Sequence, residues 1–410
     1  MKASRRAVPS APSRTMVVVL RSLIVALASA LTGVLGLLGV VSLSMARRVV
    51  TPGDRVPDTA VVGIDTSAQT ITLRRTDDTV LPGRYGLFTA GDAGYVKLGT
   101  VLSTNGDTVT RKLLTHVARG ARIAPDAAFS GWYYDVPEQL HLPFTTEVVG
   151  GPVGPCPAWV FPAAEPTDTW VIQVHGRGAT RAECLRAVPV FHAAGLTTLV
   201  VSYRNDGEAV RTPAGTYGLG ATEWRDVDAA LGEARRRGAR RIVVMGWSMG
   251  GAIALQLSLN SAHRDLIAGL VLDSPVADWR VVLGHQAQLN RLPRPVATLA
   301  MRALQREWTG PAAGVDVPIP FDRLDMVARA AELRHPILIL HSDDDGYVPS
   351  DASHQLFAAR PDLVELEVFR VARHTKLWNY DQDRWSGAIC AWLDRHGLSP
   401  AAAQRGEAAS

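Results

Sequence analysis

The chain has 410 residues, of which 47% are hydrophobic and 20% charged, and its formal net charge is only +4. This is the composition of an ordinary globular protein, and the length allows two or three domains. Basic residues are interspersed with acidic ones rather than gathered in a stripe, which argues against a nucleic-acid partner.

The N-terminus carries a segment that is long and apolar enough to enter a membrane. Residues 22–46 include no charged side chain, and about 20 apolar residues suffice to cross a bilayer. The preceding segment, 1–21, is basic, which predicts a cytoplasmic N-terminus and an exported remainder. A cleaved signal peptide, with a secreted product, is the alternative, because residues 44–46 read SMA. Secretory apolar regions are shorter, so we favour an uncleaved single-pass anchor.

Three cysteines, Cys156, Cys184 and Cys390, are too few for a disulfide framework. If the domain is exported, Cys156 and Cys184 form the pair that is most readily bridged. Cys390 lies in an apolar helical pattern and is expected to be a buried thiol. No spacing of Cys and His residues suggests a metal site.

After the anchor, residues 50–145 are expected to form a small β-rich module. Short strand patterns alternate there, and Thr104-Asn105-Gly106 is a strong hairpin signal between two of them. The module is too short for a propeller. The strand patterns cover 59–65, 69–75, 95–103 and 107–114.

Residues 146–397 show a different pattern, in which apolar strands alternate with helices. Such alternation predicts an α/β fold, with a mostly parallel sheet covered by helices on both faces. Residues 276–334 interrupt it with proline-broken helices and are expected to form a lid. The tail, 398–410, lacks a core-forming pattern and is expected to be disordered. The strand patterns cover 169–176, 197–205, 240–246, 268–275, 335–345 and 363–371.

The segment GWSMGG at 246–251 lies between a strand pattern and a helix pattern. In that context G-x-S-x-G indicates a nucleophile elbow, with Ser248 in a strained turn above the sheet. Gly246 and Gly250 remove side chains that would collide there. The N–H of Met249 would be one donor of an oxyanion hole.

A serine nucleophile needs a base that is held by an acid, and in this fold the chain order is Ser, acid, His. The candidate bases are His354, His374 and His396. We select His374, because it follows the last strand directly and so lies at the carboxyl edge of the sheet. His354 falls within a helix, and His396 is expected to cap a helix end.

Four aspartates are candidates for the acid: Asp343, Asp344 and Asp345 follow one strand, and Asp273 follows the strand before it. Aspartates also stabilise turns, so spacing alone does not choose among them.

Residues 150–396 resemble the α/β-hydrolase superfamily, and more narrowly its serine-peptidase-like and acylaminoacyl-peptidase-like esterases. The family's acid lies in a segment H-G-x-x-D-x-x-V-P, and the matching HSDDDGYVP implies that Asp345 is the acid. The sequence departs from the family at Ser342, where glycine is usual, and at Arg373, which replaces the glycine before the base.

The loop HGRGAT at 175–180 is expected to complete the oxyanion hole. Gly176 and Gly178 let the backbone approach a substrate, and the resemblance implies that the Arg177 N–H is the second donor. The Arg177 side chain is interpreted as a partner of Glu183. His175 precedes Ser248 in the chain, and we interpret it as structural.

Together these residues predict a membrane-anchored serine hydrolase that cleaves a small-molecule or lipid ester through an acyl-enzyme, without metal or cofactor. Two alternatives remain open. One is a serine peptidase that hydrolyses amides, and the other is a non-catalytic hydrolase-like protein that binds a ligand or partner.

Overall fold

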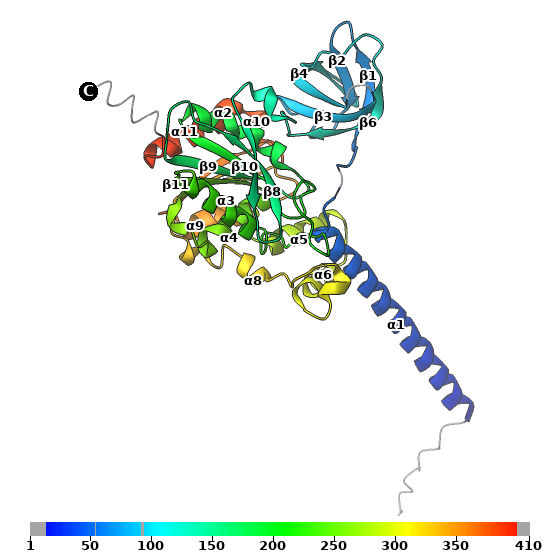
Figure 1. The fold of residues 1–410 in the computed structure, drawn as a ribbon. Helices are drawn as coiled ribbons and strands as arrows, with labels where there is room; N and C mark the ends of the chain where they lie inside the picture. Colours follow the sequence, from blue (N-terminus) through cyan, green and yellow to red (C-terminus); the bar gives the residue numbers. More distant parts are fainter. Residues whose placement is uncertain (1–13, 54, 92–93, 400–410) are drawn as a thin grey trace, which may run out of the picture.

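The computed structural model describes residues 14–53, 55–91 and 94–399, which form a long helix, a β-barrel and an α/β domain (Figure 1). Most of the expected tail, 398–410, and the first part of the basic segment, 1–21, lie outside the described residues.

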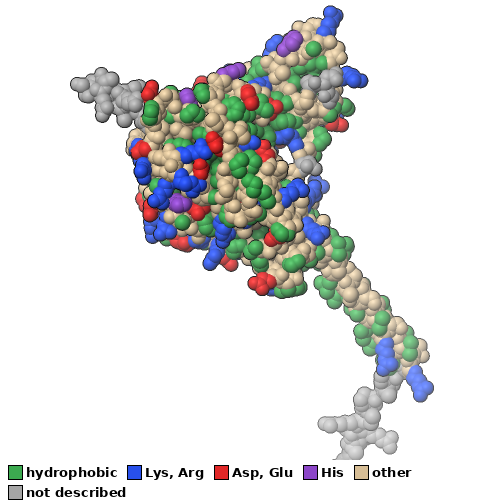
Figure 2. Space-filling model, in the orientation of Figure 1, with side chains coloured by type: hydrophobic (Ala, Val, Ile, Leu, Met, Phe, Trp, Pro, Cys, Tyr) green, Lys and Arg blue, Asp and Glu red, His purple; other side chains and the backbone are tan. Residues whose placement is uncertain are grey.

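The N-terminal helix α1 (Arg14–Val50) projects from the body of the protein, and hydrophobic side chains are spread along it (Figure 2). Its apolar part has a mean hydropathy of 2.4 and is not buried. By length and composition α1 is therefore a possible membrane anchor or signal sequence. Only Ser42, Ala46 and Val50, spaced one helical turn apart, are buried.

The predicted β-rich module is a closed six-stranded barrel with strand order β1-β2-β5-β4-β3-β6. The hairpin at Gly106 is confirmed, since Asn105 pairs with Thr108 across it. Two strands, β3 and β6, were not expected from the sequence. The strands are β1 (Thr59–Asp65), β2 (Thr70–Arg74), β3 (Tyr85–Gly91), β4 (Tyr95–Asn105), β5 (Thr108–Leu113) and β6 (Ile123–Ser130).

The α/β domain contains an eight-stranded sheet with order β14-β13-β12-β11-β9-β10-β8-β7, as expected for an α/β-hydrolase fold. Strands β9 to β14 are parallel, whereas β7 and β8 form an antiparallel edge. The strands are β7 (Thr145–Gly150), β8 (Pro155–Phe161), β9 (Thr169–Val174), β10 (Thr197–Val201), β11 (Arg241–Trp247), β12 (Ile267–Asp273), β13 (Ile337–Ser342) and β14 (Val364–Phe369).

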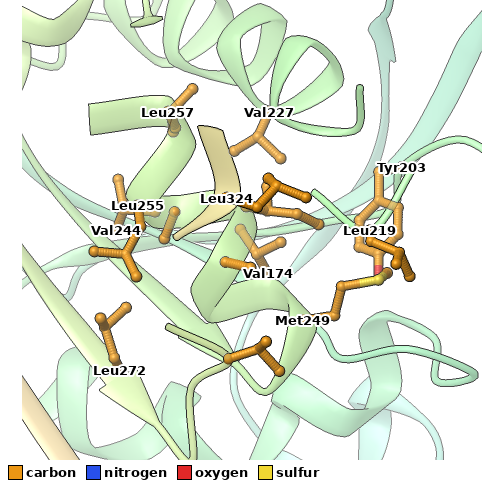
Figure 3. Close-up of a cluster of buried hydrophobic side chains, with 14 of the residues drawn as sticks. Val174, Tyr203, Leu219, Val227, Val244, Met249, Leu255, Leu257, Leu272 and Leu324 are labelled. Atoms are coloured by element: carbon orange, nitrogen blue, oxygen red, sulfur yellow. The ribbon is translucent and has the colours of Figure 1, made fainter. Parts of the chain in front are cut away.

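Helices cover both faces of this sheet (Figure 1). On one face α3 (Trp224–Arg236) and α4 (Met249–Asn260) pack over the strands, and Figure 3 shows the apolar cluster there. On the other face lie α2 (Val188–Ala193) and α11 (Gln382–Arg395). Because strand residues alternate between faces, the sheet core is buried on both sides.

Cys156 and Cys184 form no disulfide, so the bridge considered between them is not formed, and Cys390 is half-buried rather than buried as expected. Cys156 belongs to the apolar cluster on the α3/α4 face, and Cys184 to the cluster on the opposite face. The sheet therefore separates their sulfur atoms. Burial raises the pKa of the Cys156 thiol to about 12, which makes it unreactive.

The insertion 276–334 forms short helices between β12 and β13: α5 (Trp279–Leu289), α6 (Arg294–Gln305), α7 (Gly310–Ala313) and α8 (Phe321–Leu324). Helices α6 and α7 pack against α1. The insertion thus supports the root of the N-terminal helix.

Candidate active site

Ser248 occupies the sharp turn between β11 and α4, with backbone angles φ 51° and ψ −115°. This conformation is strained for a residue with a side chain. A Cβ added to Gly246 would lie 2.3 Å from the carbonyl oxygen of Gly250. A Cβ added to Gly250 would lie 2.2 Å from the carbonyl oxygen of Val174. Both positions therefore require glycine, as the motif predicted.

The structure brings Ser248, His374 and Asp345 together at the carboxyl edge of the sheet. His374 Nε2 lies 3.0 Å from Ser248 Oγ, and His374 Nδ1 lies 2.7 Å from Asp345 Oδ2. The other oxygen of Asp345 accepts the N–H groups of Tyr347 and Val348 at 2.8 and 2.9 Å. These bonds fix the carboxylate while it faces the imidazole.

The charge of Asp345 determines how the imidazole is protonated. Burial raises the pKa of Asp345, but attraction to His374 and hydrogen bonds from His341 and His374 outweigh burial and leave it below its usual range. The carboxylate is therefore ionised and can only accept hydrogen bonds. The hydrogen between the two groups is consequently on His374 Nδ1, which donates it to Asp345. Nε2 is then free to accept the Ser248 hydroxyl proton.

The other aspartate candidates have different partners. Asp273 is buried, and its carboxylate accepts the indole N–H of Trp385 at 2.8 Å. Asp343 bonds His354 at 2.8 Å on the surface. Asp344 accepts a hydrogen bond from Arg373 at 3.3 Å. None of these three carboxylates contacts His374.

The other two candidate bases have partners other than Ser248: His354 bonds Asp343, and His396 bonds Glu365. His354 is exposed on α9 (Asp351–Ala359), and His396 caps the end of α11. His175 is fully buried, stacks on Tyr203 and bonds Asp206 through Nε2 at 3.1 Å. Its structural interpretation fits this environment.

The expected oxyanion residues lie beside the serine. Met249 is the first residue of α4, where a helical N–H has no acceptor within the helix. A Cβ on Gly176 would approach Ser248 Cβ to 3.2 Å, and Gly178 has φ +68°. The loop at Arg177 is therefore close to the nucleophile and depends on its glycines.

The expected pair between the Arg177 side chain and Glu183 is wrong. Glu183 accepts the N–H of Gly176 at 2.7 Å. The Arg177 guanidinium instead donates to the carbonyls of Arg48, Val49 and Thr51 at 2.7 to 2.8 Å. It satisfies carbonyls that the end of α1 leaves without partners. The loop at Arg177 is thereby fastened to the N-terminal helix.

A cavity of about 390 Å³ opens in front of His374. One side consists of hydrolase loops, including Gly178 and Tyr347, and the opposite side is the barrel segment 129–132. No described residue from 276–334 lines it, although the insertion was expected to cover the site as a lid. The barrel forms the wall of this cavity instead.

Two residues that support the site, Arg186 and Asn379, were not predicted from the sequence. Arg186 is buried and donates to the carbonyl of Thr375 at 2.7 Å, which supports the loop after His374. It also bonds Asn379, which contacts the barrel. Arg186 shares its short helix, Arg181–Ala187, with Arg181 and Glu183, so its charge alone did not distinguish it in the sequence.

Within the described ranges, no group of three or more His, Cys, Asp or Glu residues is arranged to hold a metal ion.

Comparisons with known proteins agree with this architecture. The model described as "Alpha/beta hydrolase family" matches residues 171–388, and "Domain of unknown function (DUF8805)" matches residues 60–130, the barrel. No curated protein matches the sequence.

Several solved structures are similar to the chain. Pyrococcus furiosus esterase Pf2001 is 17% identical, with 63% of this chain and 94% of that chain covered and a TM-score of 0.49. Esterase EaEST from Exiguobacterium antarcticum is 15% identical, with 61% and 100% covered and a TM-score of 0.45. Est1E from Butyrivibrio proteoclasticus is 16% identical, with 61% and 98% covered and a TM-score of 0.46.

Proposed function

Because this chain belongs to the alpha/beta hydrolase family, we propose that it is a serine hydrolase with Ser248 as nucleophile, His374 as base and Asp345 as acid. One observation carries the proposal: the hydroxyl, imidazole and carboxylate form an unbroken series of contacts of 3.0 and 2.7 Å. These distances permit proton transfer without rearrangement.

The reaction is acyl transfer to water. His374 Nε2 removes the Ser248 proton as Oγ attacks the carbonyl carbon, and Asp345 stabilises the resulting imidazolium. The N–H groups of Met249 and Arg177 hold the oxyanion, and each such donor contributes about 2.7–4 kcal/mol at the transition state. His374 then protonates the leaving group. A water molecule, activated by the same imidazole, attacks the acyl-enzyme and releases the acid.

Within this reaction class we propose an ester rather than a peptide as substrate. A peptidase that selects a free amino terminus needs carboxylates to bind it, whereas both carboxylates of the cavity have partners in the protein. Asp78 bonds Lys376, and Glu183 bonds the Gly176 N–H. We also propose that the chain is one of the serine-peptidase-like and acylaminoacyl-peptidase-like esterases, which its sequence resembles. A panel of p-nitrophenyl esters and aminoacyl anilides tests the preference for an ester, and turnover of anilides alone would contradict it.

Covalent labelling distinguishes an enzyme from a binding protein. A fluorophosphonate probe should label the intact chain and fail to label Ser248→Ala. Ser258→Ala is the matched control, because Ser258 is buried in the same helix and bonds only a helix carbonyl. If the intact folded chain takes no label, the binding alternative replaces the enzymatic one.

We also propose that α1 is retained as an anchor, with the catalytic domain outside the cytoplasm. Cleavage after Ala46 would remove Ser42 and Ala46 from their buried positions against the insertion. It would also shorten the helix whose end Arg177 binds. Tags at both ends of the chain test retention. A membrane-bound product that carries both tags is expected, and a soluble product without the N-terminal tag would contradict the anchor.

A further inference from the structure

The cavity in front of His374 contains more positive than negative side chains. Two carboxylates and four permanent cations line it: Asp78 and Glu183, with Arg55, Arg177, Arg373 and Lys376. A surplus of positive charge around an open cavity attracts an anion. A cation that has no partner within the protein is the one best able to bind that anion.

Three of the cations have partners. Lys376 Nζ lies 3.2 Å from Asp78, and Arg373 lies 3.6 Å from Asp78 and 3.3 Å from Asp344. Arg177 is bound to the carbonyls at the end of α1. These three side chains are held in place by groups of the protein itself.

Arg55 differs from them. Its guanidinium carbon lies 3.3 Å from the centre of the Phe88 ring and 4.4 Å from that of Trp132. Among the described residues it forms no ion pair. Burial lowers its pKa and the charge of Glu183 raises it, but an arginine stays protonated. Contact with the rings leaves the N–H groups at the guanidinium edge available to another acceptor.

We propose that the substrate carries, beside its ester group, a carboxylate or phosphate that binds Arg55 in this cavity. Arginine presents parallel N–H donors that match the oxygens of such an anion. Phe88 and Trp132 hold the plane of the guanidinium, so little side-chain freedom is lost on binding. This proposal rests on the proposed function, because it places the anion in the space that faces His374.

Three matched pairs of esters test the proposal with the full-length chain in detergent. The first places a carboxylate on the acyl part: p-nitrophenyl hemiglutarate against p-nitrophenyl valerate. The second places it on the alcohol part: 4-acetoxybenzoate against its methyl ester. The third replaces carboxylate by phosphate: 1-butyryl-glycerol 3-phosphate against 1-butyryl-glycerol. A hydrogen bond to a charged group predicts about a 10-fold or greater preference in kcat/KM for the anion in at least one pair.

Substitution of Arg55 assigns the preference to this residue. Arg55→Gln should reduce the anionic-to-neutral ratio about 10-fold, Arg55→Lys should restore part of it, and added salt should weaken it in the parent. Arg74→Gln is the control, since Arg74 is an exposed barrel arginine paired with Asp107. Its ratio should match that of the parent.

Two results would overturn the proposal: no preference in any pair, or a preference that Arg55→Gln leaves intact. Either result leaves the proposed function standing if neutral esters are hydrolysed and Ser248 is labelled. If no ester is hydrolysed and Ser248 takes no label, the proposed function fails, and this inference fails with it.

Discussion

Asn379 joins the barrel to the α/β domain, and its replacement by alanine should disturb the substrate cavity. Its buried amide nitrogen donates to the carbonyls of Arg84 and Gly131 at 2.7 and 2.8 Å, and its amide oxygen accepts a bond from Arg186 at 2.7 Å. Arg84 and Gly131 belong to the barrel side, which forms the cavity wall opposite His374. The amide therefore determines where that wall stands.

The cost of Asn379→Ala follows from the groups that lose their partner. Two main-chain carbonyls lose their donor, and Arg186 keeps only its bonds to main-chain carbonyls of Glu183 and Thr375. A buried polar group without a partner costs about 1–3 kcal/mol. The contact between barrel and domain should therefore weaken by roughly 2–6 kcal/mol. Because 1.4 kcal/mol corresponds to a factor of ten, even the lower figure increases separation of the two parts substantially.

Hydrolysis of the preferred ester and limited proteolysis measure this effect. Asn379→Ala should lower kcat/KM about 10-fold or more, mainly through KM, and should speed cleavage between barrel and domain. Gly83→Ala should act alike, since its Cβ would lie 1.9 Å from the Asn379 carbonyl oxygen. Asn290→Ala, at an exposed helix end, serves as control. If Asn379→Ala matched this control in both assays, the barrel would not shape the site.

Three further substitutions test the site itself. Asp345→Asn should lower kcat about 10⁴-fold, because the amide no longer selects the His374 tautomer. Folding lowers the pKa of Asp345, so its carboxylate stabilises the fold above about pH 4, and this contribution is lost on acidification. Urea unfolding measures this contribution. The difference in unfolding free energy between parent and variant should shrink from pH 7 to pH 3. Gly250→Ala places a Cβ 2.2 Å from the Val174 carbonyl oxygen. This clash should lower the Tm of the protein and abolish fluorophosphonate labelling of Ser248. Normal labelling would contradict the steric argument. Arg177→Met removes three hydrogen bonds to the end of α1 and should lower kcat up to about 100-fold through a looser oxyanion loop, whereas unchanged kinetics would separate α1 from catalysis.

The parallel sheet and the serine turn were predictable because each depends on local sequence. Strand β11 is apolar from Ile242 onward, and it ends at Trp247, directly before Ser248. Such a run must be buried on both faces, and a glycine-flanked serine at its end has few alternative structures. His374 followed from the same logic, because the loop after β14 must end at the same edge of the sheet.

The complete barrel was not predictable, because two of its strands are interrupted by residues that are uncommon in strands. Strand β6 reads IAPDAAFS, and β3 contains two glycines. Alanine, proline, aspartate and glycine are depleted in strands. Their extended conformation depends on pairing with neighbours, with β3 paired to both β4 and β6. Tertiary contacts of this kind are invisible to a local pattern.

The barrel and the end of α1 support the loops that surround Ser248. The insertion after β12 packs against α1 and donates a hydrogen bond from Gln286 to the carbonyl of Tyr347, while the barrel bounds the cavity in front of His374. Arg177 connects the oxyanion loop to the end of α1, while Arg186 and Asn379 connect the His374 loop to the barrel. Both loops that flank Ser248 are therefore positioned by segments that precede the α/β domain in the chain. Hydrogen bonds of about 3 Å restrict the movement of these loops. The α/β domain alone would therefore contain every side chain of the proposed triad and still lack the supports that align them.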